Sequence, residues 1–205
     1  MSRPYHHGDL GRALLDAALA LIEETGAGAL TLRAVARRVG VTHAAPYRHF
    51  EDKAALLAAV AGEGFKLLTE RMTTARDAVE GDARARMTAI GVAYVGFAVE
   101  HTAHYRVMFG RDLDGLPAEH PFRAAGQAAF GVLTGCVAEL MGRPGEPCGA
   151  SSACTDRAIV AWATVHGLAL LMADRRLPWP ADPVARDAFV AGLLREHHRL
   201  LADGG

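Results

Sequence analysis

Apolar residues recur along most of this chain with the three-to-four-residue period of an α-helix. In residues 10–25, leucine and alanine return at every third or fourth position and form one apolar stripe. Gly26 then ends the pattern. By the same criterion, further helices are expected over residues 31–40, 43–50, 54–79, 82–101, 102–109, 121–141, 156–175 and 183–201. We therefore predict an all-α protein with about nine helices.

Residues 31–53 have the pattern of two short helices joined by a tight turn. Thr31 is a preferred N-cap residue for the first helix, and Gly40 suits its end because glycine tolerates positive φ. Thr42 is then expected to cap the second helix. Two helices joined by a short turn that contains glycine are typical of a helix-turn-helix motif. The helix over residues 10–25 would complete a three-helix DNA-binding domain.

The second helix of this motif contains Pro46 near its first turn, where the missing N–H is tolerated. The outer side of this helix carries polar and basic residues, which in a helix-turn-helix would enter the major groove. The residues predicted to contact DNA are Arg33, Thr42, His43, Ala44, Tyr47, Arg48, His49 and Lys53. The alternative is a three-helix module whose basic face is coincidental.

Side-chain chemistry suggests different roles for these residues. His43 could donate to a guanine edge or to a phosphate, and the small Thr42 and Ala44 could contact a thymine methyl group. Tyr47 and Lys53, together with His49, are better suited to phosphates, which orient a protein without reading sequence. We therefore expect base reading at the start of the second helix.

Asp52 is the expected cap of a long helix that follows the motif. Gly62 and Gly64 weaken the middle of this helix, so a bend is plausible there. Because no Pro- or Ser-rich linker separates it from the motif, it would couple the two parts mechanically rather than as a flexible tether.

Bulk composition adds little to this picture. The chain has 205 residues, 51 % of them apolar, and a formal net charge of −1. It can therefore bury a sizeable core, and only the local clustering of basic residues suggests nucleic acid. Three cysteines without a C-x-x-C pair predict neither a structural disulfide nor a zinc finger. No segment has the pattern of a signal peptide or membrane span, so a soluble cytoplasmic protein is expected.

The segment GVTHAAPYRHFEDKAALL resembles the recognition-helix signature of the TetR (tetracycline-repressor-like) family. The matching residues are Val41, Thr42, Tyr47, His49, Phe50, Lys53, Leu56 and Leu57, and the upstream TLRAVARRVG also fits the family pattern. The resemblance implies a homodimer that binds a near-palindromic operator on double-stranded DNA and is released by a small-molecule effector. It implies a DNA-binding domain over residues 1–50 and an effector-binding and dimerisation domain over residues 51–203.

The helix expected over residues 156–175 is apolar on nearly all sides. Such a helix should be buried on more than one face, and in a small helical domain the second face would meet another subunit. Together with the last helix it would form a dimeric four-helix bundle. Trp162, His166 and Gly167 also resemble the W-H-G pattern that names a subclass of TetR C-terminal domains.

A mostly apolar effector pocket with a few polar groups is predicted in the central helices. The proposed effector-binding residues are Tyr94, Phe97, His101, Tyr105, Met108, Phe130, Trp162 and His166. Ordinary core packing is the alternative for each of them. Because enzyme motifs and metal-ligand spacing are absent from the sequence, no catalytic residue, metal site or cofactor is predicted. Two other functions remain open: a metal- or small-molecule-binding helical protein that does not bind DNA, and an activator rather than a repressor.

Overall fold

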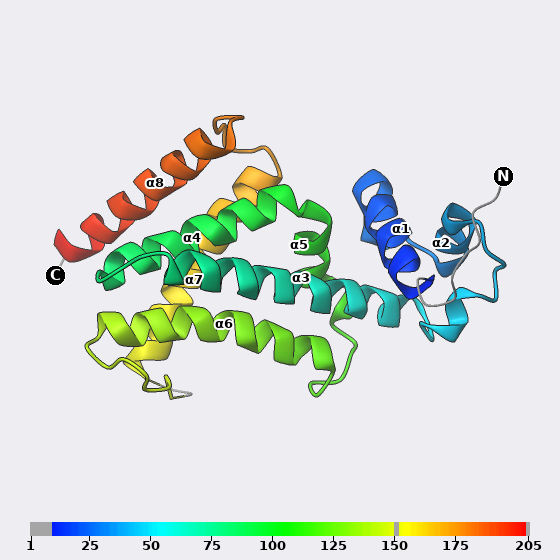
Figure 1. The fold of residues 1–205 in the computed structure, drawn as a ribbon, viewed down its shortest axis with the longest axis horizontal. Coiled ribbons are helices and arrows are strands. Elements are labelled where there is room, and N and C mark those ends of the chain that lie inside the picture. The colour runs from blue at the N-terminus through cyan, green and yellow to red at the C-terminus, as the bar shows by residue number, and fades with distance from the viewer. Residues whose placement is uncertain (1–9, 150–151, 204–205) are drawn as a thin grey trace. The chain divides into compact units, whose positions relative to one another are not determined.

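The computed structural model describes residues 10–149 and 152–203, without the side chains of residues 198 and 200–203. Within those residues it contains helices and no strands, which confirms the all-α prediction (Figure 1). The α-helices are α1 (Leu10–Thr25), α2 (Leu32–Val39), α3 (Lys53–Asp77), α4 (Ala83–Glu100), α5 (Thr102–Met108), α6 (Pro121–Leu140), α7 (Ala153–Ala173) and α8 (Pro183–Asp203). Three short 3₁₀ helices are η1 (Ala27–Ala29), η2 (Pro46–Arg48) and η3 (Arg111–Leu113).

The helices group into two compact units. The first contains residues 1–64 and 102–124, and the second contains residues 65–101 and 125–205. Helix α5 belongs to the first unit because it packs on α1. The predicted functional division at residue 50 therefore does not coincide with these packing units, and it stays a prediction.

The local signals expected at the helix-turn-helix motif are present. The Thr31 side chain accepts a hydrogen bond from the Ala34 amide at 3.1 Å, as an N-cap does. Gly40 adopts φ 80°, a left-handed conformation that ends α2, and its amide donates to the Ala36 carbonyl. Val35, in the middle of α2, is fully buried. These contacts set where α2 begins and ends.

The second helix of the motif differs from its prediction. Instead of an α-helix over residues 43–50, the structure has the 3₁₀ helix η2, and Thr42 provides no side-chain cap. Pro46 has no N–H, so it cannot donate to the Thr42 carbonyl, which accepts from the Ala45 amide at 3.0 Å instead. The tighter pattern continues with the bond from His49 to the Pro46 carbonyl at 2.9 Å. Proline thus shortens this element further than we expected.

Helix α3 runs without interruption through both of its central glycines, and Asp52 caps it by accepting from the Ala55 amide at 2.8 Å. Glu63 on this helix links two others in the first unit. Its carboxylate lies 2.7 Å from Arg12 Nη1 on α1 and 3.4 Å from the buried His104 Nε2 on α5. Helices α1 and α5 are thus held to the same stretch of α3.

Gly64 lies where α3 and α5 approach closely. A Cβ at this position would lie 2.5 Å from Met108 Sδ and 3.1 Å from His104 Cβ. We expect Gly64→Ala to lower the free energy of unfolding by about 1–2 kcal/mol, because one of these side chains must shift.

Gly62→Ala is the matched control, since its Cβ would meet Phe122 at an ordinary 3.8 Å. It should be neutral or stabilising by up to about 1 kcal/mol. Urea unfolding followed by circular dichroism measures both, and equal losses would contradict this account.

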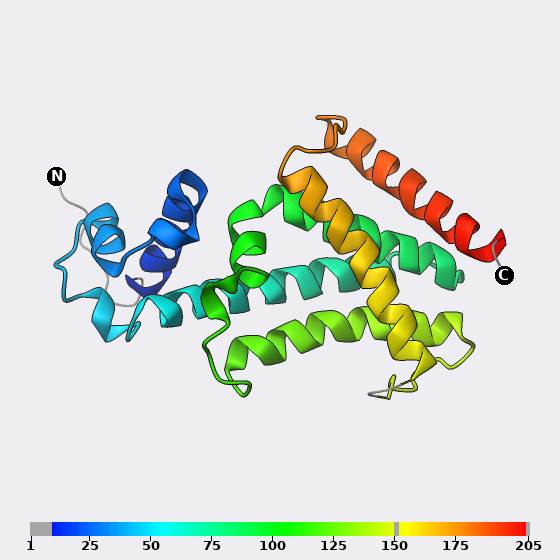
Figure 2. The same ribbon diagram turned by 180° about the vertical axis from the view of Figure 1, so that it is seen from behind.

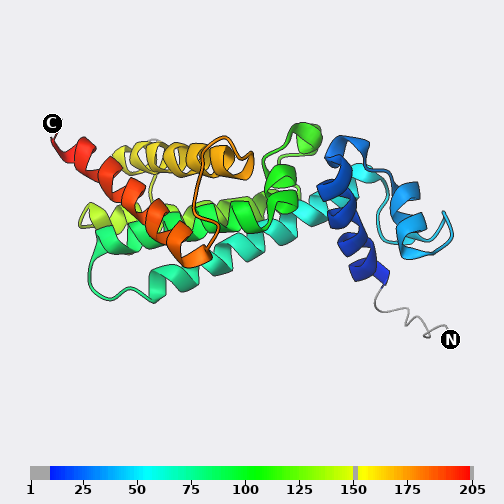
Figure 3. The same ribbon diagram turned by 90° about the horizontal axis from the view of Figure 1, so that it is seen from above.

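The second unit is built around α4. Every residue of α4 from Ala93 to Ala98 is buried, and α7 and α8 both pack against this helix (Figure 2; Figure 3). Gly91 permits this packing, because a Cβ there would lie 2.6 Å from Leu194 Cδ1 on α8 and 3.3 Å from Val165 on α7. Helix α4 is therefore a central helix rather than one with a single buried face.

A disulfide that the sequence did not predict joins the loop after α6 to the first turn of α7. Cys148 and Cys154 are bonded, with Cα atoms 5.4 Å apart. Ser152 caps α7 by accepting from the Thr155 amide, so the helix begins earlier than expected and brings Cys154 near Cys148. The third cysteine, Cys136, is buried, and burial raises the pKa of its thiol to about 11. It is therefore a neutral core residue at pH 7.

Candidate DNA-binding and effector sites

Most of the predicted DNA-contacting residues lie together on one exposed segment. Residues 42–44 and 47–49 are exposed, and 60 % of the Tyr47 surface is accessible. Arg33 is also exposed, at the start of α2. Beside this segment, Arg38 is paired with Glu24 at 2.5 Å, which leaves Arg33, Arg37 and Arg48 as the more available cations. This arrangement offers donors for phosphates and base edges on a short, well-defined turn.

Lys53 differs from the other predicted DNA contacts. Its Nζ donates to the Gly28 carbonyl at 2.9 Å and lies 3.9 Å from Asp112 Oδ1. The side chain is half-buried and joins the start of α3 to the η1 turn. A phosphate contact would have to share or replace these interactions, so Lys53 first of all holds the first unit together.

Four of the predicted effector residues form one cluster in the second unit. Tyr94 Oη lies 2.8 Å from His166 Nδ1 and accepts from Trp162 Nε1 at 3.3 Å. Phe130 meets Trp162 edge to face, with ring centroids 6.0 Å apart. Burial lowers the pKa of His166, so a neutral imidazole is favoured near pH 7. Helices α4, α6 and α7 thus place aromatic surface beside hydrogen-bonding groups.

The other four predicted effector residues do not join this cluster. Phe97 and His101 stack on each other within the second unit, with ring centroids 5.0 Å apart. Tyr105 and Met108 are buried in the first unit, where Tyr105 lies against Phe109. Among the residues described, no group of three or more His, Cys, Asp or Glu side chains is arranged to hold a metal ion.

A charged network that the sequence did not predict ties α3, α4 and α8 together. Arg186 on α8 is only 5 % exposed, and its Nη2 lies 2.6 Å from Glu100 Oε1 and 2.9 Å from Asp187 Oδ1. Glu100 also pairs with Arg71 on α3. Hydrogen bonds from Arg71 and then Arg186 lower the pKa of Glu100 to about 2. Gly96 leaves room for both guanidinium groups, since a Cβ there would lie 2.7 Å from Arg71 Nη2.

A capped helix that ends at a glycine turn, followed by an exposed second element, is the arrangement of a helix-turn-helix protein. Comparison with known families agrees. The model of the tetR family of bacterial regulatory proteins matches residues 14–60, and that of a tetracyclin repressor-like C-terminal domain matches residues 87–196. The second match covers more than half of the chain. The protein belongs to the TetR family of helix-turn-helix transcriptional regulators.

Individual proteins of known sequence or structure are also similar to this chain. A protein of unknown function from Rhodococcus sp. RHA1 is 36 % identical, with a TM-score of 0.73, and the match covers 95 % of this chain and 98 % of that one. A tetR-family regulatory protein from Rhodococcus RHA1 is 22 % identical, with a TM-score of 0.68 and coverage of 90 % and 94 %. An HTH-type transcriptional regulator of Mycobacterium bovis is 33 % identical over 124 residues, 55 % of this chain. That match spans about half of the regulator's own length, 53 %.

Proposed function

We propose that the protein is a ligand-released repressor that binds a near-palindromic operator as a homodimer in the cytoplasm, without catalytic activity. The observation that carries this proposal is the set of exposed residues 42–44 and 47–49, which follow the capped and glycine-terminated α2 of a TetR-type DNA-binding domain, the head. A single short segment reads few bases, so specific binding calls for a second copy. Two heads would engage half-sites about 34 Å apart, one turn of DNA.

Exposed apolar residues on α7 support the homodimer. Ile159, Val160, Leu170 and Leu171 are each about half exposed. Between them lies Gly167, where an added Cβ would meet no atom within 4 Å. Soluble monomers rarely leave several large apolar side chains of one helix in water, and the small residue would let a second helix approach closely. These residues would form the second face of α7 that we expect to meet another subunit.

By length and composition alone α7 could also cross a membrane, contrary to the expectation from the sequence. We assign its exposed apolar face to a second copy of the chain instead. Asp156 and Arg157 are exposed in its first turns, and the cluster around His166 packs its other side against α4. A helix with charged residues and an internal hydrogen-bonded histidine fits a protein interface better than lipid.

The effector would bind beside the cluster of Tyr94, Phe130, Trp162 and His166. Its polar groups could orient a ligand while the aromatic rings provide apolar contact area. Helix α3 has residues in both units without a break, so it is the element that could transmit a change between them. The dimer would have two states, one with the heads spaced for the operator and one with a different spacing. A ligand that binds the second state more tightly would shift the population towards it, and the dimer would then leave the DNA.

A gel-shift titration with the intergenic DNA upstream of the gene tests the proposed function. We expect a specific complex at low salt that weakens steeply as salt rises, because phosphate contacts release counterions. Random DNA of equal length is the control and should bind at least about 1,000-fold more weakly. If no complex forms at low salt, the chain is not a DNA-binding regulator, and the helical ligand-binding alternative stands.

The same titration separates the roles of head residues. Tyr47→Ala should weaken binding to operator and random DNA alike, since a phosphate contact carries no sequence information. His43→Ala should weaken operator binding by about 1–3 kcal/mol and leave random DNA unchanged. Arg176→Gln removes an exposed arginine outside the head and serves as the charge control. An equal loss on both DNAs for His43→Ala would reject its role in base reading.

A further inference from the structure

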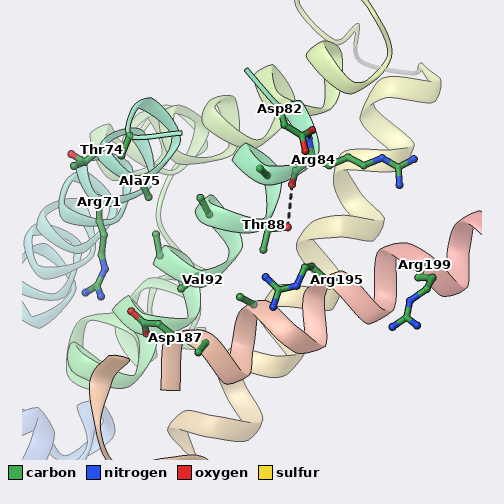
Figure 4. A pocket seen from close by; sticks show the side chains of 16 residues that line it. Arg71, Thr74, Ala75, Asp82, Arg84, Thr88, Val92, Asp187, Arg195 and Arg199 are labelled. Atoms are coloured by element: carbon green, nitrogen blue, oxygen red, sulfur yellow. Dashed lines mark hydrogen bonds between the residues drawn. The ribbon is translucent and has the colours of Figure 1, made fainter. Parts of the chain in front are cut away.

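A groove of about 1050 Å³ lies within the second unit, between α3, α4 and α8 (Figure 4). Seven alanines and Val92 form its apolar walls, and Thr74 and Thr88 also line it. Its charged lining consists of Arg71, Arg84, Arg195, Arg199, Asp82 and Asp187. None of the proposed effector residues lines this groove, so it is distinct from the cluster around His166. Small side chains on three neighbouring helices leave the space open.

The arginines are distributed unevenly along the groove. Helices α4 and α8 are antiparallel, since Gly91 lies against Leu194 while Glu100 pairs with Arg186. The start of α4 therefore meets the end of α8. Figure 4 accordingly draws Arg84, Arg195 and Arg199 towards one end of the groove, and Arg71 with Asp187 towards the other.

Charges at the Arg71 end are already compensated. Arg71 pairs with Glu100, and Asp187 accepts from Arg186 at 2.9 Å. This end belongs to the network that holds α3, α4 and α8 together. It therefore has little charge left to offer a ligand.

Charges at the other end are not fully compensated. Arg199 pairs with Glu196, and the Asp82 carboxylate caps α4 by accepting from the Arg84 amide at 2.9 Å. Among the described residues, no ion pair or hydrogen bond engages the guanidinium of Arg84 or Arg195. Two available guanidinium groups at this end, with one carboxylate, make it the anion-attracting part of the groove.

We propose that this groove binds a small amphiphile, with an anionic carboxylate or phosphate head at Arg84 and Arg195 and an apolar body over the alanine walls. Charge complementarity sets the position of the head, because in the part of the chain that the structure describes the uncompensated positive charge of the groove lies towards the Arg84 end. The alanines and Val92 provide apolar contact without polar partners, which suits a hydrocarbon chain. The volume is at the upper end of the sizes of ligand pockets in proteins, which leaves room for a hydrocarbon chain. The proposal concerns binding alone and does not depend on DNA recognition.

Isothermal titration of the full-length protein with decanoate, below its micelle concentration, tests the site, and 1-decanol is the matched neutral probe. Decanoate should bind at least about tenfold more tightly, because only its carboxylate can accept from the arginines. Inorganic phosphate, which lacks the apolar body, should bind more weakly than decanoate. Equal affinities for decanoate and 1-decanol, or no binding of decanoate, would overturn the proposal.

Variants place the bound probe in the groove. The double substitution Arg84→Gln and Arg195→Gln should weaken decanoate about tenfold or more and leave 1-decanol unchanged. Arg176→Gln, outside the groove, should change neither. Ala89→Leu should weaken both probes by filling the space between α4 and α8. Unchanged decanoate binding in the double variant would reject this site.

Sedimentation with phosphatidylglycerol vesicles distinguishes a free ligand from a lipid surface. We expect no co-sedimentation that depends on Arg84 and Arg195. Co-sedimentation that the double substitution abolishes would contradict a small-molecule site.

Discussion

Leu170→Glu is expected to convert the protein from a dimer to a monomer at micromolar concentration and to lower its operator affinity by at least about 100-fold. Leu170 is 46 % exposed in the single chain, so the change should alter the stability of the subunit little. In the proposed dimer the carboxylate would be buried without a partner, which is unfavourable by several kcal/mol. A monomer would then engage one half-site instead of two, and it would lose the contribution of the second head.

Analytical ultracentrifugation and a gel shift on the same samples measure this effect. Leu140→Glu is the matched control, because Leu140 is a leucine of similar exposure, 39 %, on α6 rather than on the last two helices. It should leave both the oligomeric state and the operator affinity unchanged. If Leu170→Glu stays dimeric, or if Leu140→Glu dissociates the dimer instead, the interface does not lie on α7.

The parts of the fold that depend on neighbouring residues could be predicted from the sequence. Thr31, Gly40 and Asp52 act through hydrogen bonds or dihedral angles within a few positions, and each is found in its expected role. The helical period likewise located most helices, because one apolar stripe must be buried wherever a helix packs. Pro46 marks the limit of this reasoning. A proline near the start of a helix is tolerated, and the sequence predicts this. It does not predict that residues 46–48 form a 3₁₀ helix instead of an α-helix.

The candidate site depends more on contacts between distant segments, which no local pattern reveals. Glu100 and Arg186 are separated by 86 positions, and both look like ordinary surface residues in the sequence. Lys53 likewise resembles a phosphate contact until the Gly28 carbonyl is found beside it. The predicted effector residues resemble one another in chemistry, but of these eight only Tyr94, Phe130, Trp162 and His166 form one cluster. Residue chemistry identifies candidates, whereas tertiary packing decides which of them can act together.

Glu100→Gln is expected to lower the free energy of unfolding by about 2 kcal/mol at pH 7. Removing one partner of a buried ion pair typically costs about 3–5 kcal/mol. The effect is smaller here because the Glu100 side chain is 37 % exposed and Arg186 keeps Asp187 as a second partner. Glu146→Gln is the control, since its pair with Arg143 is exposed on both sides and should contribute less than about 1 kcal/mol.

The pH dependence of this loss identifies its electrostatic origin. The two arginines hold the pKa of Glu100 at about 2 in the folded protein, below its ordinary value of 4.5. A depressed carboxyl pKa stabilises the fold fully above the ordinary value, and this contribution disappears as the pH falls towards 2. Urea unfolding should therefore show the largest difference between wild type and Glu100→Gln above about pH 5, with a steady decrease at lower pH. If the difference in the free energy of unfolding does not change with pH, Glu100 acts through packing. If the difference vanishes on acidification, the charge of Glu100 is what links α4 to α8.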